Sequence, residues 1–123
     1  MSQIPARDIE IPTRVRSAVA AIQDRKARDL LVLELAEISD FTDFFLLSTG
    51  SSERQVRAIA DAVDERLRED GVRALHIEGY EHGQWVLMDY GDFLVHIFYE
   101  PTREYYQLER LWADAPNVTP EFE

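Results

Sequence analysis

The stretch Gln84–Tyr99, QWVLMDYGDFLVHIFY, constrains the fold more than any other part of the chain. Two runs rich in Val, Ile, Phe, Tyr and Trp, Trp85–Met88 and Phe93–Tyr99, flank a short link that contains Gly91. Such runs around a glycine-containing link are typical of a β-hairpin in which the glycine adopts a positive φ. The second run is apolar on both faces apart from His96, which indicates a strand near the middle of a covered sheet.

The rest of the chain supplies helices and further strands for this hairpin. Apolar runs predict strands over 30–35, 43–49 and 74–77, and helical periodicity predicts helices from Thr13, over 52–70 and from Pro101. Ser52 and Gln55 have the spacing of a capping box at the start of the second helix. A strand–helix–strand unit over 43–77 should be a right-handed crossover between parallel strands. The sequence therefore predicts an α/β fold with a mixed five-stranded β-sheet and flanking helices.

The two ends of the chain lack clear periodicity. Residues 1–11 are expected to form a loose arm, and residues 114–123, with Pro116 and Pro120, a frayed tail. We therefore expect a single domain, 1–123, with its core at about 13–113. The last helix should turn four side chains toward the core: Tyr105, Leu108, Leu111 and Trp112.

The net charge of −11 is unevenly distributed along the chain. Residues 1–28 carry +3 and the remainder carries −14. No Lys or Arg lies between Arg73 and Arg103, a stretch that contains five carboxylates. Such a segment repels phosphate but attracts a basic protein. We therefore expect no sequence-specific binding of nucleic acid. The alternative is that the acidic charge serves solubility alone.

Several functional classes find no support in the sequence. The chain has no cysteine, which excludes disulfides and thiolate chemistry. It has no apolar run of the ~20 residues that a membrane span needs, and no signal-peptide pattern, so a cytoplasmic protein is expected. His76, His82 and His96 lie in separate elements without metal-binding spacing. We expect no cofactor and no metal.

An alternative interpretation is a nucleotide-binding or nucleotidyltransferase-type enzyme. Gly50-Ser51-Ser52 lies at a strand-to-helix turn, where such folds bind phosphate. This chemistry also needs paired carboxylates to hold metal ions, and the strand over 74–77 is followed by Glu78 alone. Gly and Ser also favour any helix start, so the sequence favours a protein that is not an enzyme.

A protein-binding face fits the aromatic content better. Nine of the thirteen Phe, Tyr and Trp residues lie between residues 80 and 112. Trp85, Leu87 and Asp89 should share one strand face, and Tyr90 at the turn could reach over the same edge. An aromatic anchor beside a carboxylate is typical of an interface hot spot. The alternative is that Trp85 belongs to the core.

Five segments carry a resemblance to a known family. Asp40–Phe45 with Thr49–Ser52, Glu78-Gly79 followed by Trp85–Ile97, and the helix Arg103–Trp112 are similar to motifs of the ribosomal silencing factor, or Iojap-like, family. The match covers about residues 13–113 in order and spacing. The chain departs from the family pattern where Phe93 and Leu94 replace the common Val-Val or Val-Ile pair.

The resemblance implies a non-enzymatic factor with a nucleotidyltransferase-like fold that lacks the catalytic carboxylates. Family members bind the fourteenth protein of the large ribosomal subunit and block joining of the small subunit, which represses translation when nutrients are scarce. Related organellar proteins take part in large-subunit assembly. Free members tend to be homodimers. Carried over by residue, the partner-binding patch is expected to comprise Trp85, Leu87, Asp89, Tyr90, Gly91, Arg103 and Tyr106.

Overall fold

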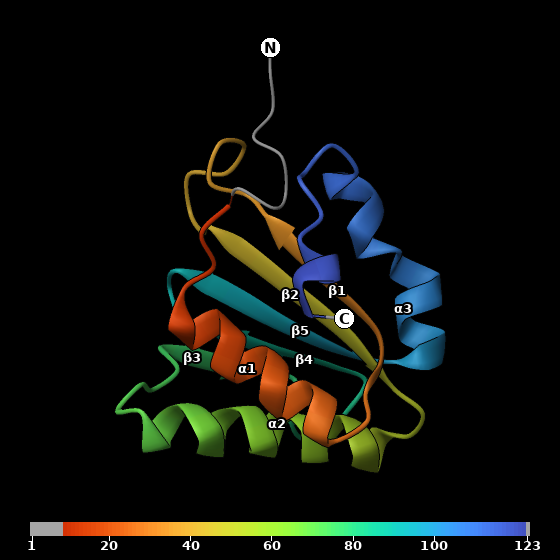
Figure 1. Cartoon of the computed structure of the whole chain (residues 1–123). Helices are drawn as coiled ribbons and strands as arrows, with labels where there is room; N and C mark the ends of the chain where they lie inside the picture. Colours follow the sequence, from red (N-terminus) through yellow and green to blue (C-terminus); the bar gives the residue numbers. More distant parts are fainter. Residues whose placement is uncertain (1–8, 123) are drawn as a thin grey trace.

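The computed structural model of the chain describes residues 9–122. These residues form three α-helices, five strands and two short 3-10 helices (Figure 1). In chain order the elements are α1 (Thr13–Asp24), β1 (Arg28–Glu34), β2 (Phe44–Gly50), α2 (Glu53–Glu69), β3 (His76–Glu78), β4 (Trp85–Asp89), β5 (Phe93–Tyr99), α3 (Glu100–Tyr106), η2 (Leu108–Trp112) and η3 (Thr119–Phe122).

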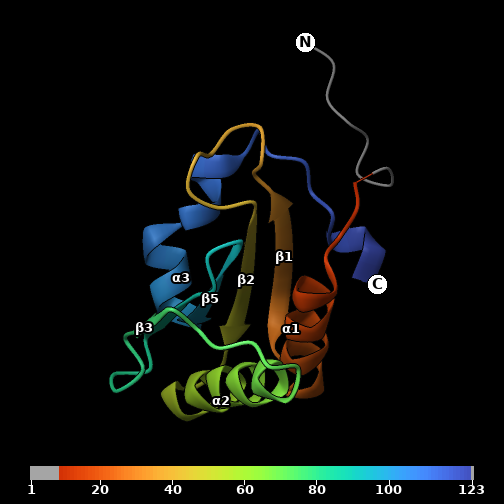
Figure 2. The same ribbon diagram turned by 90° about the vertical axis from the view of Figure 1, so that its left-hand side faces the viewer.

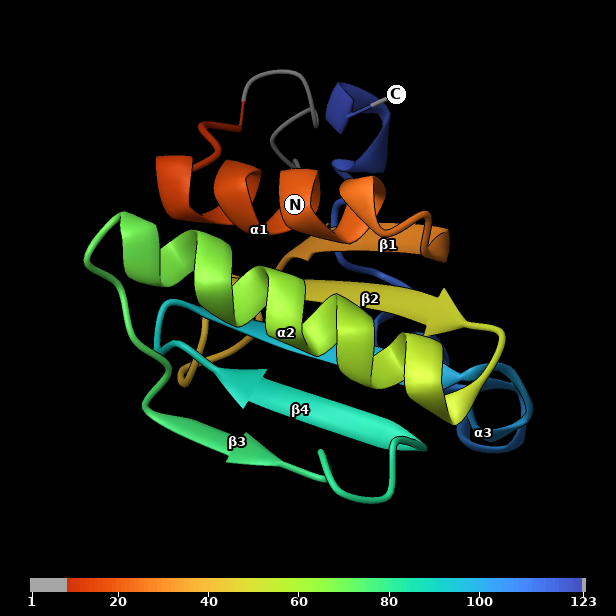
Figure 3. The same cartoon turned by 90° about the horizontal axis from the view of Figure 1, so that it is seen from below.

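The five strands form one sheet with the order β1-β2-β5-β4-β3. β2 and β5 are parallel, and the other neighbouring pairs are antiparallel. This arrangement confirms the predicted mixed five-stranded α/β fold. β2 and β3, which α2 connects, run in the same direction as predicted, although β5 and β4 lie between them. α1 and α2 cover one face of the sheet, and α3 lies on the opposite side (Figures 2 and 3).

The central hairpin has the predicted form. β4 pairs with β5 so that Trp85 lies opposite Phe98 and Asp89 lies opposite Leu94. Gly91 in the link has a φ of 86°, a backbone conformation that glycine adopts without the steric cost of a Cβ. The glycine-containing link therefore sets both the turn and the register of the two central strands.

The boundaries of α2 also follow from its sequence. The Ser52 hydroxyl accepts a hydrogen bond from the Gln55 N–H at 3.0 Å, and Gln55 Oε1 accepts the Ser51 N–H at 2.6 Å. The helix ends at Glu69 with Asp70 as its C-cap, and Gly71 follows with a φ of 76°. The predicted cap at Ser52 and the terminating glycine are both confirmed.

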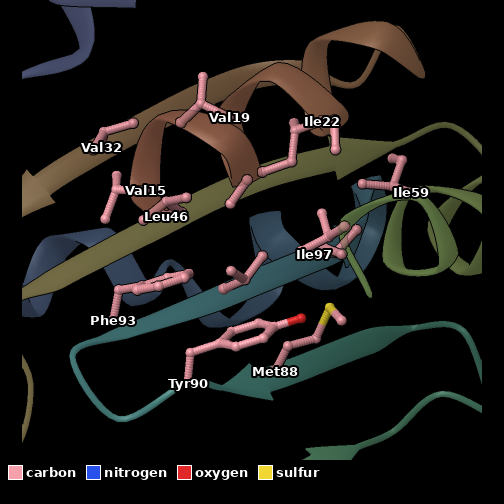
Figure 4. Close-up of a cluster of buried hydrophobic side chains, with 14 of the residues drawn as sticks. Val15, Val19, Ile22, Val32, Leu46, Ile59, Met88, Tyr90, Phe93 and Ile97 are labelled. Carbon is pink, nitrogen blue, oxygen red and sulfur yellow. The ribbon is translucent and has the colours of Figure 1, made fainter. Parts of the chain in front are cut away.

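Two apolar clusters lie on the two faces of the sheet. The larger one fills the space between the sheet and helices α1 and α2, where Val19, Leu46 and Ile97 meet (Figure 4). Full burial of a side chain of this kind stabilises the fold by about 1.5–3 kcal/mol. The smaller cluster on the opposite face comprises Leu33, Leu35, Phe45, Leu47, Phe98 and Ala115. Both faces are therefore packed, although only the first is covered by long helices.

The C-terminal segment is not frayed, and the prediction of a loose tail is wrong for the described residues up to 122. Val118 is fully buried, and its N–H donates to the Val32 carbonyl at 2.9 Å. The Val32 N–H donates in turn to Thr119 Oγ1 at 2.8 Å. β1 is an edge strand whose outer polar groups need partners, and this segment provides them.

The predicted N-terminal arm and last helix also need correction. Residues 1–8 lie outside the described part, but Ile11 is buried in the main core, so residues 9–11 are not loose. The expected helix from Pro101 breaks at Gln107, which has a φ of 47°. Tyr105 on α3 and Leu111 beyond the break are both exposed, so the prediction that they face the core is wrong. Leu108 and Trp112 do pack, partly buried, against the smaller cluster.

Candidate functional site

The side of β3, β4 and β5 that faces away from α2 is termed here the open sheet face. Along β4, Val86 and Met88 are fully buried on the α2 side, whereas Trp85, Leu87 and Asp89 alternate with them and are half-buried. This alternation confirms that these three predicted site residues share one face. α3 and η2 pack over β5 and β2, so β4 and β3 are the strands of this face that stay accessible.

An unbroken series of ring contacts runs from α3 over β4, β5 and β2 to the loop before β2, and we call it the aromatic row. The centroids of neighbouring rings are 4.8–6.4 Å apart, within the range of favourable aromatic pairs. In order the row comprises Tyr105, Tyr106, Trp85, Phe98, His96, Phe45, Trp112 and Phe41. The row therefore joins α3, three strands, η2 and the loop before β2 into one surface.

The middle of the aromatic row is buried and both of its ends are exposed. Phe98 and Phe45 belong to the smaller core cluster. At one end Tyr105 is 81% and Tyr106 55% exposed, and at the other end Phe41 is 62% exposed. Exposed aromatic rings that pack on buried aromatic rings are typical of a binding surface rather than of an ordinary solvent-exposed surface.

Trp85 belongs to both the core and the surface. Its ring packs against Phe98 at 4.8 Å and against Tyr106 at 5.2 Å, and its Nε1–H donates to Nδ1 of His96 at 3.1 Å. The indole also lines a hollow of about 400 Å³ together with Glu78, Gly79 and Leu87. The alternatives of core residue and interface anchor therefore do not exclude one another for Trp85.

His96 is the only histidine with a buried position among the described residues, since His76 and His82 are exposed. Burial lowers the pKa of His96 to about 4, so its imidazole is neutral near pH 7. Phe45 approaches the imidazole edge-on at 4.9 Å. His96 is therefore a hydrogen-bonded histidine of the sheet, with Trp85 as its partner.

Asp89 and Gly91 form the turn at one end of the open sheet face. Asp89 Oδ1 accepts a hydrogen bond from the Gly91 N–H at 2.8 Å. Asp89 thus stabilises the hairpin link in addition to presenting a carboxylate beside Leu87. Asp89 shares the strand face of Trp85 but lies four residues away, at the other end of β4, and Gly91 lies beyond the strand in the turn.

Tyr90 lies on the other face of the sheet, and the expectation that it reaches over the edge beside Trp85 is wrong. Its ring stacks on Phe93 at a centroid distance of 4.9 Å, and the residue is only 5% exposed (Figure 4). Burial raises the pKa of its hydroxyl above the ordinary value. Strand alternation explains the position, because Tyr90 continues the even-numbered series of Val86 and Met88.

Arg103 holds α3 against the sheet rather than projecting from the surface. Its side chain is only 11% exposed. Nη1 donates to the Asp29 carbonyl at 2.6 Å and to Thr49 Oγ1 at 2.8 Å, and Nε donates to Glu109 at 3.3 Å. Arg103 therefore positions the helix that carries the exposed Tyr106.

The turn Gly50-Ser51-Ser52 uses its polar groups internally. The Ser51 hydroxyl donates to Gln55 Oε1 at 2.8 Å, and the Ser52 hydroxyl caps α2. A Cβ at Gly50 would lie 2.8 Å from Val56 Cγ2, so this glycine allows the close approach of α2 to β2. Within residues 9–122 we find no group of three or more His, Asp or Glu side chains that could hold a metal ion.

Two contributors to the surface escaped the sequence analysis as site residues. Phe41 extends the aromatic row at the far end, where its ring lies 6.4 Å from that of Trp112. Leu111, next to Trp112, is 75% exposed. A signal for Phe41 was available, since an aromatic side chain in a polar loop is hard to bury, but Leu111 depends on the break at Gln107.

The chain is similar to several known proteins. Residues 8–123 match the family described as "Ribosomal silencing factor during starvation". The chain is 46% identical over 101 residues to the ribosomal silencing factor RsfS of Halalkalibacterium halodurans, covering 82% of this chain and 86% of that protein. No α-helix in the described part of the chain is long and apolar enough to cross a membrane.

A solved structure and a more distant relative extend these matches. A crystal structure of a protein from Chromobacterium violaceum superimposes with a TM-score of 0.81 at 37% identity, covering 85% of this chain and 88% of that one. The mouse protein named "Mitochondrial assembly of ribosomal large subunit protein 1" is 28% identical over 112 residues, covering 89% of this chain and 49% of that protein.

Proposed function

This chain belongs to the family of ribosomal silencing factors, whose members are ribosome-associated regulators of translation, and we propose that it binds the large ribosomal subunit. The contact is made with the fourteenth protein of that subunit, on the surface that the small subunit needs for joining. A folded domain of 14.3 kDa bound there excludes the small subunit and represses translation under nutrient limitation. The name of the mouse relative, an assembly protein of the large subunit, supports the choice of subunit.

The observation that carries this proposal is the aromatic row on the open sheet face. Its exposed Tyr106 end, with the hollow lined by Trp85 and Leu87 beside it, offers a preformed apolar surface. Because the rings are held by the sheet and by each other, little side-chain freedom is lost when a partner docks. A rigid aromatic surface of this kind suits a folded protein partner.

The charge around the open sheet face selects a basic partner. Glu78 borders the hollow at Trp85, and no Lys or Arg occurs from residue 74 to residue 102. Ribosomal proteins are basic because they neutralise RNA phosphates. Opposite charge raises the association rate and disfavours direct contact of this face with ribosomal RNA.

The proposed mechanism is steric and needs no chemical turnover. The protein acts as long as it occupies the joining surface, so repression depends on its concentration and affinity rather than on a rate constant of catalysis. We further propose that the chain acts in the cytoplasm. The free protein is proposed to form a homodimer through the same apolar face, and dimerisation then competes with binding to the ribosome.

The test is binding of the purified protein to bacterial large subunits by co-sedimentation in sucrose gradients. The Trp85→Ala variant should bind at least about thirtyfold more weakly, because truncation of an interface Trp typically costs about 2 kcal/mol or more. Leu75→Ala is the matched control, since Leu75 is 75% exposed but lies outside the aromatic row. Its affinity should equal that of the wild type.

Joining of subunits is measured separately by light scattering after mixing large and small subunits. The wild-type protein should reduce joining, and Trp85→Ala should restore it. Trp85→Ala also removes contacts to Phe98, so its melting temperature is measured in parallel. A folded Trp85→Ala variant with wild-type affinity would contradict the proposed face.

A further inference from the structure

We propose that His96 is a positioning residue of the open sheet face. It holds the indole of Trp85 in one orientation, so that Trp85 presents carbon atoms to a partner and keeps its N–H inside the protein. This inference rests on the proposed function, because it takes Trp85 as a contact residue for the large subunit.

The hydrogen bond between the two side chains fixes the tautomer of His96 and the rotamer of Trp85. Trp85 Nε1–H donates to His96 Nδ1 at 3.1 Å. A neutral imidazole that accepts at Nδ1 carries its proton on Nε2, so a single tautomer fits this geometry. An indole N–H that is partly buried without an acceptor costs free energy. The rotamer of Trp85 that keeps this bond is therefore favoured over those that turn the ring outward.

The acceptor itself is held rigidly. His96 is 5% exposed and lies on β5, in register with Leu47 of β2 on one side and Leu87 of β4 on the other. Its imidazole meets Phe45 edge-on at 4.9 Å and is parallel to the Phe98 ring, with an interplanar angle of 12°. A central strand and two aromatic neighbours thus leave the imidazole no room to follow a moving indole.

Two consequences for binding follow from this arrangement. Immobilising a side chain on binding costs affinity, and a Trp85 ring that is already fixed avoids about a 2- to 10-fold loss. In addition, the indole N–H is occupied by His96 and is not offered to the partner. The partner therefore meets Trp85 through apolar contact and needs no hydrogen-bond acceptor at this position.

Two substitutions separate positioning from packing. His96→Leu fills the buried position with an apolar side chain that has no hydrogen-bond acceptor. His96→Asn can instead place a carbonyl oxygen near the position of Nδ1. The first readout is hydrogen exchange of the Trp85 indole N–H in the free protein by NMR, with the Trp112 indole as the internal reference. The second readout is the affinity for isolated large subunits by co-sedimentation, with melting temperatures measured for every variant.

His96→Leu should accelerate exchange of the Trp85 indole and weaken binding by about 2- to 10-fold, and His96→Asn should restore both toward the wild-type values. Unchanged indole exchange in His96→Leu would overturn the inference. So would unchanged affinity of His96→Leu when Trp85→Ala binds weakly, or equal losses in both His96 variants that track their melting temperatures. If Trp85→Ala itself binds like the wild type, the proposed function fails at this face, and the inference fails with it.

Discussion

Acid should destabilise this protein through one buried side chain, His96. In the folded state burial lowers the pKa of His96 from 6.5 to about 4. Between these two pH values the unfolded chain binds a proton that the folded chain does not, so the free energy of unfolding falls as the pH falls. Each pH unit in this window removes up to about 1.4 kcal/mol, which gives about 3 kcal/mol for the whole window.

The cause of this shift is desolvation alone, since the rings around His96 are those of Trp85, Phe45 and Phe98. No carboxylate among these neighbours can stabilise an imidazolium. Protonation would also remove the acceptor from the Trp85 indole. A loss of about 3 kcal/mol is a large part of the ~5–15 kcal/mol that stabilises a typical domain.

The assay is urea unfolding of the wild type and of His96→Asn at pH 7.0 and pH 4.5. All other ionisable groups are the same in the two proteins, so the difference between them isolates His96. We expect the wild type to lose about 2 kcal/mol more than the variant between these pH values. An equal loss in both proteins would refute the reasoning, because it would mean that His96 accepts a proton in the fold without penalty.

Three further predictions concern stability and are read from thermal or urea unfolding. Ser52→Ala should lower the free energy of unfolding by about 1 kcal/mol through loss of the α2 cap, and an unchanged value would assign the cap elsewhere. Gly79→Ala should destabilise the fold severely, because its φ is +80° and a Cβ would overlap the Trp85 carbonyl oxygen. Gly71→Ala is the control, since Gly71 has a similar φ but open space around it, and it should cost only about 1 kcal/mol. Similar losses at both sites would contradict the steric argument. Thr119→Val should cost about 1–3 kcal/mol because it removes the acceptor of a buried N–H in β1, whereas Thr119→Ser should be close to wild type; a neutral Thr119→Val would show that the C-terminal segment contributes little.

The parts of the fold that local chemistry determines were predictable from the sequence. Gly91 permits the positive φ of the hairpin link, and Ser52 caps α2 through its own hydroxyl. Strand alternation placed Trp85, Leu87 and Asp89 on one face. Each of these features depends on residues within a few positions of one another, so the amino-acid pattern contains the necessary information.

The errors concern features that depend on distant parts of the chain. No local signal marks the left-handed conformation of Gln107, which breaks the expected last helix and exposes Leu111. The C-terminal segment looked frayed because its pairing with β1 joins residues far apart in the sequence. The prediction for Tyr90 is wrong for a different reason: a turn position favours an exposed side chain, but the alternation of β4 continues through this residue and buries it.

The pairing of the C-terminal segment with β1 also orders events during synthesis of the protein. The hydrogen bond from Val32 to Thr119 spans 87 residues, and Gln23 of α1 donates to the Phe122 carbonyl across 99 residues. A nascent chain emerging from the ribosome therefore exposes an unpaired strand edge until residues 116–122 have left the exit tunnel. Until then the sheet can capture neighbouring strands, so premature termination shortly before Pro116 should yield aggregating chains rather than a slightly shortened fold.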